Sequence, residues 1–330
     1  MRFPTLLPAF IALAALAGCA KSGQDVPAAG SGLTKVRFQT DWFPQPEHGG
    51  YYQALAKGYF AAEGLDVEIL PGGPNAQVLA GVATGRVQFG MTNGDDLIVA
   101  ISRGLPLKMV AAEMQRDAQG ILFHEQNPIR HLRDLDGKTI MAGAGSVWIQ
   151  LVQQKYGIKF SLLPLVGDLA RFMNDRSFIQ QCFVTNEPFF ARQRGARVGA
   201  LLIAHPGYEP YRVMLTSDAF LRENPEIVRK FVRAALRGWT EYLTGDPTAA
   251  NTLIKRRRPD LPDEFFAYSI TAMKDYQLVL GDPARGEKMG QLTAARLETQ
   301  IKLLRDLRMT ERDLKVEDVA TFDFLPPEAR

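Results

Sequence analysis

Segments with the pattern of β-strands alternate with segments of helical spacing in this chain of 330 residues. Val36–Thr40 and Asp66–Leu70 alternate as strands do, and Tyr51–Glu63 between them has helical apolar spacing and stops at Gly64. The same succession continues to Glu113. Strands that alternate with helices in this way imply a mostly parallel sheet with helices on both faces. The predicted fold class is therefore α/β.

A second alternation of the same kind follows. Ile121–His124 and Lys138–Ala142 have strand patterns, and Val147–Tyr156 has helical spacing, whereas the chain from Asn224 to Leu307 is mainly helical. In open α/β sheets, ligands bind beyond the carboxyl ends of the strands. Here those positions carry glycine, proline, polar and aromatic residues. This pattern predicts two sheets and a crevice that binds a small molecule.

The composition excludes several other classes of protein. The formal net charge is only +3, and lysine and arginine are spread along the chain rather than massed, which argues against a nucleic-acid partner. The chain has two cysteines, Cys19 and Cys182, too few for a disulfide framework or a multi-cysteine metal site. We expect no metal and no cofactor.

The N-terminus has the pattern of an export signal. Arg2 precedes an uncharged apolar run that ends Leu-Ala-Gly-Cys at positions 16–19. This ending resembles the bacterial lipoprotein signal, in which the cysteine is acylated. We predict a signal peptide at 1–18, lipid attachment at Cys19 and a flexible tether at 19–34, with the exported protein anchored to a membrane. The alternative is an ordinary signal peptide cut near Ala20.

Three segments carry a family resemblance: TDWFPQPEHGGYYQALAKGYFAAEGLDVEIL at 40–70, DLDGKTIMAGAGS at 134–146 and ENPEIVRKFVRAALRGWTEYLTGDPTAA at 223–250. They resemble solute-binding proteins related to the thiamine-pyrimidine synthase family. The resemblance implies a type II periplasmic binding protein, with two lobes that close over a ligand and an ABC transporter permease as partner. Lobe 1 would comprise 35–120 plus 211–330, and lobe 2 would comprise 121–210. We expect a monomer.

The strand ends and the resemblance together give the candidate ligand-binding residues, which are Trp42, His48, Glu187, Tyr208, Gly145, Ser146, Asn93, Asn75 and Asp41. An indole or phenol ring can stack on a planar ligand. The Glu187 carboxylate can accept two N–H bonds from an aminopyrimidine edge.

Each of these residues also has a purely structural alternative. Trp42 could belong to the core, and His48 could cap the helix that starts near Tyr51. The two asparagines could be N-caps, as asparagine often is between a strand and a helix. Glu187 before Pro188 also fits the first turn of a helix.

These features favour a solute receptor for an ABC importer, with a thiamine pyrimidine precursor as the ligand. Riboflavin is the first alternative. A taurine-like or alkanesulfonate ligand is the second, because the candidate loops offer aromatics and an acid rather than the arginine or lysine that a sulfonate needs. A surface protein that only senses or scaffolds is a further alternative. The resemblance extends to a pyrimidine synthase, but 205–215 lacks that enzyme's run of cysteines, and no lysine follows His48 until Lys57. We therefore expect a protein that is not an enzyme.

Overall fold

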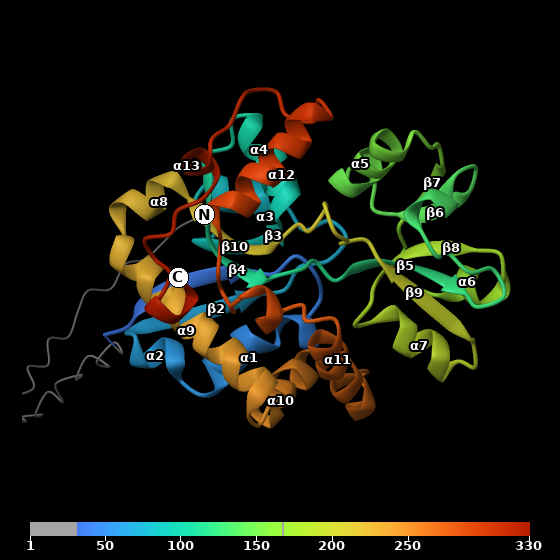
Figure 1. Cartoon of the computed structure of the whole chain (residues 1–330). Coiled ribbons are helices and arrows are strands. Elements are labelled where there is room, and N and C mark those ends of the chain that lie inside the picture. Colours follow the sequence, from blue (N-terminus) through green and yellow to red (C-terminus); the bar gives the residue numbers. More distant parts are fainter. Residues whose placement is uncertain (1–31, 167) are drawn as a thin grey trace, which may run out of the picture. The chain divides into compact units, whose positions relative to one another are not determined.

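The computed structural model describes residues 32–166 and 168–330, which contain two five-stranded sheets (Figure 1). The first sheet has the order β2-β1-β3-β10-β4 and consists of β1 (Thr34–Gln39), β2 (Leu65–Leu70), β3 (Phe89–Asn93), β4 (Leu107–Met114) and β10 (Arg212–Ser217). Strand β1 pairs in parallel with β2 and β3. Strand β10 lies between β3 and β4 and is antiparallel to both.

The second sheet has the order β7-β6-β8-β5-β9. Its strands are β5 (Gln119–His124), β6 (Thr139–Ala142), β7 (Ser161–Pro164), β8 (Ile179–Phe183) and β9 (Val198–Leu202). Strand β6 is parallel to β7 and β8, whereas β5 is antiparallel to β8 and β9.

The predicted α/β class with mostly parallel sheets is confirmed: in each sheet four strands run in one direction, and a single antiparallel strand, β10 or β5, makes the sheet mixed. The antiparallel strands follow from the way in which the chain changes sheets. It passes from β4 straight into β5, and from β9 back into β10, without a helix in between. A parallel pair needs a long crossover connection, usually a helix, and β5 and β10 each enter their sheet without one.

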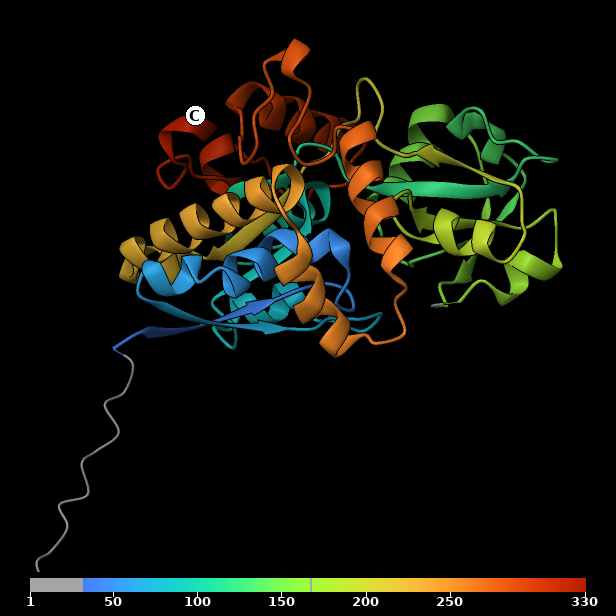
Figure 2. The ribbon, with the colours of Figure 1, turned by 90° about the horizontal axis from the view of Figure 1, so that it is seen from below.

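Helices surround the first sheet (Figures 1 and 2). They are α1 (Gly49–Ala56), α2 (Tyr59–Ala62), α3 (Val78–Ala83), α4 (Gly94–Ser102), α8 (Asp218–Glu223), α9 (Pro225–Thr244), α10 (Thr248–Arg257), α11 (Asp263–Asp275), α12 (Ala294–Asp306) and α13 (Val316–Val319). Helices α1 and α9 pack closely because Gly50 has no side chain: a Cβ there would lie 2.1 Å from the Trp239 ring. The stacked rings of Phe89 and Phe231, 3.9 Å apart, join α9 to β3.

Three helices accompany the second sheet: α5 (Val147–Tyr156), α6 (Ala170–Asn174) and α7 (Glu187–Gln193). Four short 3-10 helices complete the described chain: η1 (Pro46–His48), η2 (Leu132–Leu135), η3 (Pro283–Arg285) and η4 (Pro327–Ala329). Leu33–Arg330 forms one compact unit. The predicted signal peptide and Cys19 lie outside the described residues, and so does most of the predicted tether. Within the described part, we find no helix with the length and apolar character needed to cross a membrane.

Candidate functional site

A cavity of about 890 Å³ lies beyond the carboxyl ends of strands from both sheets. From the first sheet, the segments after β1 and β2 and the last residue of β3 line it. From the second sheet, the segments after β6, β7 and β8 line it. We call it the main cavity. Its position agrees with the expectation that ligands bind where parallel strands end.

Two adjacent aromatic side chains, Trp42 and Phe43, lie on the first-sheet side of the main cavity. Their rings meet edge to face with centroids 5.6 Å apart, and Phe43 is 41% exposed. The loop that carries them is fixed against Gly72, whose N–H donates to the Trp42 carbonyl at 3.0 Å. A Cβ on Gly72 would lie 2.3 Å from the Thr40 carbonyl oxygen, so only glycine fits there. Backbone contacts thus hold the loop in place, and the Arg258 guanidinium carbon lies 5.7 Å from the centre of the exposed Phe43 ring.

Glu187 begins α7 and lines the second-sheet side of the main cavity. Its Oε2 atom accepts a hydrogen bond from the Phe183 N–H at 2.7 Å. Burial raises the pKa of Glu187 to about 7. The side chain can therefore accept hydrogen bonds as a carboxylate or donate one as an acid near neutral pH.

Arg212, the first residue of β10, is 1% exposed and also lines the main cavity. Its guanidinium donates to Asn93 Oδ1 at 2.8 Å and to the Asp41 carboxylate. Asp117 lies 3.9 Å away. Burial opposes the charge on both partners, but the Arg212 guanidinium holds the pKa of Asp41 well below its usual range, and Asp41 raises the pKa of Arg212.

Arg212 was not among the predicted site residues, because it opens a strand, whereas the predicted positions follow strands. Arg194 and Arg258 line the main cavity as well. The expectation that arginine is absent from the cleft was therefore wrong. Arg194 directly follows α7 and Arg258 directly follows α10, so neither follows a strand. Only the tertiary fold brings these two arginines to the cavity.

Six of the nine predicted ligand-binding residues line the main cavity, namely Asp41, Trp42, Asn75, Asn93, Ser146 and Glu187. The N-cap alternative fails for Asn75, because α3 begins later and its N-cap is Gln77. Asn93 precedes α4 but makes no side-chain cap hydrogen bond. Its amide nitrogen instead donates to Asp96 at 3.1 Å.

His48, Gly145 and Tyr208 do not line the main cavity. His48 is fully buried, with its Nε2 atom 3.5 Å from the Asp41 carboxylate, and burial lowers the pKa of the ring. Gly145 adopts a φ of 91°, which permits the turn into α5 between the lining residues Ala144 and Ser146. At the start of α5, the Val147 N–H donates to Asp96 at 3.0 Å, so it is already engaged within the protein.

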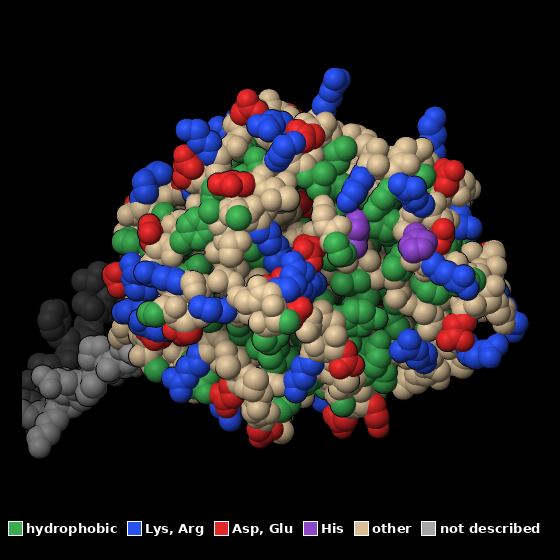
Figure 3. All heavy atoms as spheres, viewed as in Figure 1, with side chains coloured by type: hydrophobic (Ala, Val, Ile, Leu, Met, Phe, Trp, Pro, Cys, Tyr) green, Lys and Arg blue, Asp and Glu red, His purple; other side chains and the backbone are tan. Residues whose placement is uncertain are grey.

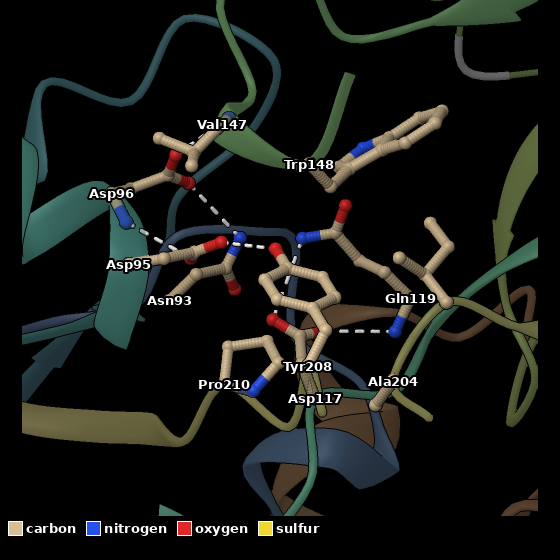
Figure 4. A pocket seen from close by; sticks show the side chains of 11 residues that line it. Asn93, Asp95, Asp96, Asp117, Gln119, Val147, Trp148, Ala204, Tyr208 and Pro210 are labelled. Atoms are coloured by element: carbon tan, nitrogen blue, oxygen red, sulfur yellow. Dashed lines mark hydrogen bonds between the residues drawn. The ribbon is translucent and has the colours of Figure 1, made fainter. Parts of the chain in front are cut away.

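Tyr208 lies in a small inner pocket together with Asp95 and Asp96 of α4 (Figure 4). Its hydroxyl donates to the Asp95 carboxylate, and the ring is 3% exposed. Burial raises the pKa of Asp95, and the adjacent Asp96 raises it further. Through these bonds, Asp95 and Asp96 join α4 to the segment after β9 and to the start of α5.

Among the described residues, no group of three or more His, Cys, Asp or Glu side chains is placed to hold a metal ion. Cys182 is free and buried, and burial raises the pKa of its thiol well above the usual range. What the main cavity does offer is aromatic side chains, amide groups and the Glu187 carboxyl, which suit non-covalent binding.

The two sheets and the position of the cavity define a periplasmic binding protein fold. A solved structure of the alkanesulfonate-binding protein SsuA from Xanthomonas axonopodis pv. citri, bound to MOPS, superposes with a TM-score of 0.65 at 16% identity, covering 88% of this chain and 98% of that one. The family model described as NMT1/THI5 like matches residues 45–250. The chain belongs to this NMT1/THI5-like family.

Named relatives include both binding proteins and enzymes. Riboflavin-binding protein RibY of Chloroflexus aurantiacus is 31% identical over 78% of this chain and 72% of its own length. The formylaminopyrimidine-binding protein of Halalkalibacterium halodurans is 24% identical, over 67% and 70%. The 4-amino-5-hydroxymethyl-2-methylpyrimidine phosphate synthase THI11 of Saccharomyces cerevisiae is 28% identical, over 66% and 69%.

Proposed function

We propose that this chain is the substrate-binding component of an ABC importer and that a neutral, planar nitrogen heterocycle occupies the main cavity. The observation that carries the proposal is the make-up of the lining. Trp42 and Phe43 offer aromatic faces, and Glu187 offers a strong acceptor. The lining also holds seven amide side chains: Gln45, Asn75, Asn93, Gln119, Gln180, Gln181 and Asn186. An amide presents a donor beside an acceptor, as the edge of such a ring does.

The charges in the lining support a neutral ligand. Arg212 is paired with Asp41, and Arg258 is paired with Asp260 at 2.7 Å. The remaining charged residues of the lining are Arg194, Asp168 and Glu187. A sulfonate would need cationic groups that no carboxylate already neutralises. Two of the three lining arginines are thus already paired, and the third, Arg194, shares the cavity with the two remaining carboxylates, so the balance of charge supports a heterocycle over a taurine-like ligand.

A thiamine pyrimidine precursor is our first candidate, because the Glu187 carboxylate suits the amino group and ring nitrogen of an aminopyrimidine. Riboflavin is the second candidate, and the volume of the main cavity favours it. At about 890 Å³, the cavity is near the upper end of the range of about 300–1,000 Å³ for pockets that enclose drug-sized ligands. The relative named as a riboflavin-binding protein adds weight to this alternative.

We further propose that the chain carries its ligand unchanged and closes two lobes over it, lobe 1 being 35–120 with 211–330 and lobe 2 being 121–210. Two hydrogen bonds that join the proposed lobes support closure. Thr185 donates to Glu47 of η1, and Asn186 donates at 2.8 Å to Gln45, which precedes η1. A ligand that touches both lobes binds the closed form more tightly than the open form and so stabilises the closed form. The permease can then recognise that closed form. Export and acylation at Cys19 belong to the same proposal.

A ligand screen tests this function. Thermal unfolding is measured with formylaminopyrimidine, hydroxymethylpyrimidine, riboflavin and taurine, each at saturation. A true ligand at about 100 times its dissociation constant adds about 2.7 kcal/mol to the free energy of unfolding. We expect stabilisation by a pyrimidine or by riboflavin and none by taurine. Stabilisation by taurine alone would overturn the choice of ligand class, and mass spectrometry that finds the bound compound converted would favour the synthase alternative.

A further inference from the structure

A second cavity, of about 390 Å³, lies in the part of the chain that forms the second sheet. Its lining comes from the segment before η2, from η2 itself, from the end of α5, from β9 and from the segment after β9. The lining residues are Arg130, His131, Leu132, Arg133, Tyr156, Leu201, Leu202 and His205. None of them lines the main cavity. We call this second cavity the basic groove.

Polar groups converge at one end of the basic groove. The Tyr156 hydroxyl lies 2.8 Å from His205 Nε2, and Lys155 Nζ lies 3.2 Å from the same atom. On the other side of the ring, His205 Nδ1 is 2.9 Å from the Ile203 carbonyl oxygen. Because a carbonyl oxygen only accepts, Nδ1 carries the proton and Nε2 is the acceptor for Tyr156 and Lys155. Lys155 does not line the groove itself, but its ammonium lies beside the groove at His205 and keeps further N–H donors beyond the one that faces Nε2.

The cations of the basic groove are not neutralised by the protein. The Arg133 guanidinium lies 5.3 Å from the centre of the Tyr156 ring, and Lys155 Nζ lies 5.6 Å from it. Among the described residues, Arg130, Arg133 and Lys155 form no ion pair within 4.0 Å. On the face drawn in Figure 3, histidine side chains lie beside Lys and Arg side chains.

The acid in η2 does not form an ion pair with these cations. Asp134 of η2 accepts the backbone N–H groups of Arg130 and His131, at 2.8 and 3.0 Å, rather than their side chains. Burial lowers the pKa of Lys155, and no carboxylate offsets this effect. A partly buried ammonium without an acid partner favours a site for an external anion.

We infer that the basic groove binds the phosphate group of a phosphate monoester. A phosphate has three acceptor oxygens and a charge of about −1.5 to −2 at neutral pH, so it can accept from Arg133 and Lys155 and can accept the hydrogen bond of the Tyr156 hydroxyl in place of His205 Nε2, which a carboxylate with two oxygens does less well. The organic part of the ester would lie against Leu132, Leu201 and Leu202, which form the apolar floor of the groove. This site is separate from the main cavity, so the inference does not depend on the proposed function.

Calorimetric titration of the full chain with phenyl phosphate tests the inference, with inorganic phosphate as a second probe. The variant Arg133→Gln with Lys155→Gln should bind phenyl phosphate about 100-fold more weakly, because two charge-assisted contacts are lost. The matched control is Arg176→Gln with Lys159→Gln, which removes the same charge at exposed residues outside the groove and should bind as the native chain does. Equal binding by both variants, or no binding by the native chain to any phosphate probe, would overturn the inference.

A second measurement separates a free ester from a lipid headgroup. The Cys19→Ala chain, which cannot be acylated, is mixed with vesicles of phosphatidylcholine alone or with phosphatidic acid added. Retention only on phosphatidic acid vesicles, lost in the Arg133→Gln, Lys155→Gln variant, assigns the groove to a lipid phosphate. Binding of phenyl phosphate without vesicle retention assigns it to a free ester. Tyr156→Phe keeps the ring and removes the hydroxyl, so it should weaken either kind of binding by about ten-fold.

Discussion

Arg212, at the start of β10, pairs with Asp41, which follows β1, and so ties the strand that returns from the second sheet to the loop that carries Trp42. Asp117, 3.9 Å from the same guanidinium, lies in the segment that leaves the first sheet. One buried cation therefore holds both chain crossings and one wall of the main cavity.

Arg212→Gln should destabilise the protein by about 3–5 kcal/mol, because it leaves the carboxylates of Asp41 and Asp117 without their buried counter-charge. Urea unfolding measures the change in the free energy of unfolding. The control Arg222→Gln, at an exposed position of α8, should stay within about 0.5 kcal/mol of the native chain. An Arg212 variant as stable as this control would contradict the role of the ion pair.

Glu47 makes the stability depend on pH. Burial raises the pKa of its carboxyl from 4.5 to about 8, so between these values the folded protein holds a proton that the unfolded chain releases. Stability should therefore fall as the pH rises from about 4.5 to 8, by up to about 1.4 kcal/mol per pH unit for this group. Below pH 4.5 both states are protonated, so stability no longer changes with pH through this group and its stabilising contribution is fully present.

Glu47→Gln keeps the acceptor for Thr185 and removes the titration. The variant should lose part of the downward slope between pH 5 and 8 and should be more stable than the native chain at pH 8. Unfolding in urea at several pH values measures this, with the exposed Glu125→Gln as control. Parallel stability curves for the native chain and Glu47→Gln would show that Glu47 is ionised in the folded state.

Tyr208→Phe tests the inner pocket. Removal of the hydroxyl leaves the buried Asp95 carboxyl without its donor and should cost about 1–3 kcal/mol of stability. Tyr276→Phe, at a tyrosine that is 39% exposed, should cost much less and serves as the control in the same thermal unfolding assay. Equal effects of the two substitutions would show that the Tyr208–Asp95 hydrogen bond does not stabilise the folded protein.

Local sequence signals predicted much of the fold. Helix α5 has the predicted bounds, Val147–Tyr156, because Gly157 ends it in the left-handed conformation with a φ of 65°. The helix predicted at 51–63 is two helices, since Gly58 with a φ of 70° interrupts it. Strand β7 was not predicted, because it is short and lies at the edge of its sheet.

The site was only partly predictable, for a physical reason. Trp42, Asn75 and Glu187 follow strands, so the position of the strand ends already brings them to the main cavity. Arg212 begins a strand instead, and it reaches the cavity because β10 runs antiparallel to β3 and starts where β3 ends. Strand direction depends on the path between the sheets, which no local pattern encodes.

Cys19→Ala should release the exported protein from membranes, because the sulfur that would carry the lipid is lost. Fractionation of cells into membrane and soluble material measures this. Cys182→Ala changes the buried free cysteine and should leave the protein in the membrane fraction. Membrane retention of Cys19→Ala would contradict acylation at this residue.

The most direct test of the central claim is a calorimetric titration of the ligand found in the screen against the native chain and two variants of the main cavity. Trp42→Ala removes a stacking face and should weaken binding by about ten-fold or more, and Glu187→Gln should weaken an aminopyrimidine by about 10–100-fold. The controls Tyr276→Ala and Glu125→Gln, outside the cavity, should bind as the native chain does. If both cavity variants fold and bind the ligand with native affinity, the ligand does not occupy the main cavity and the proposed binding site is wrong.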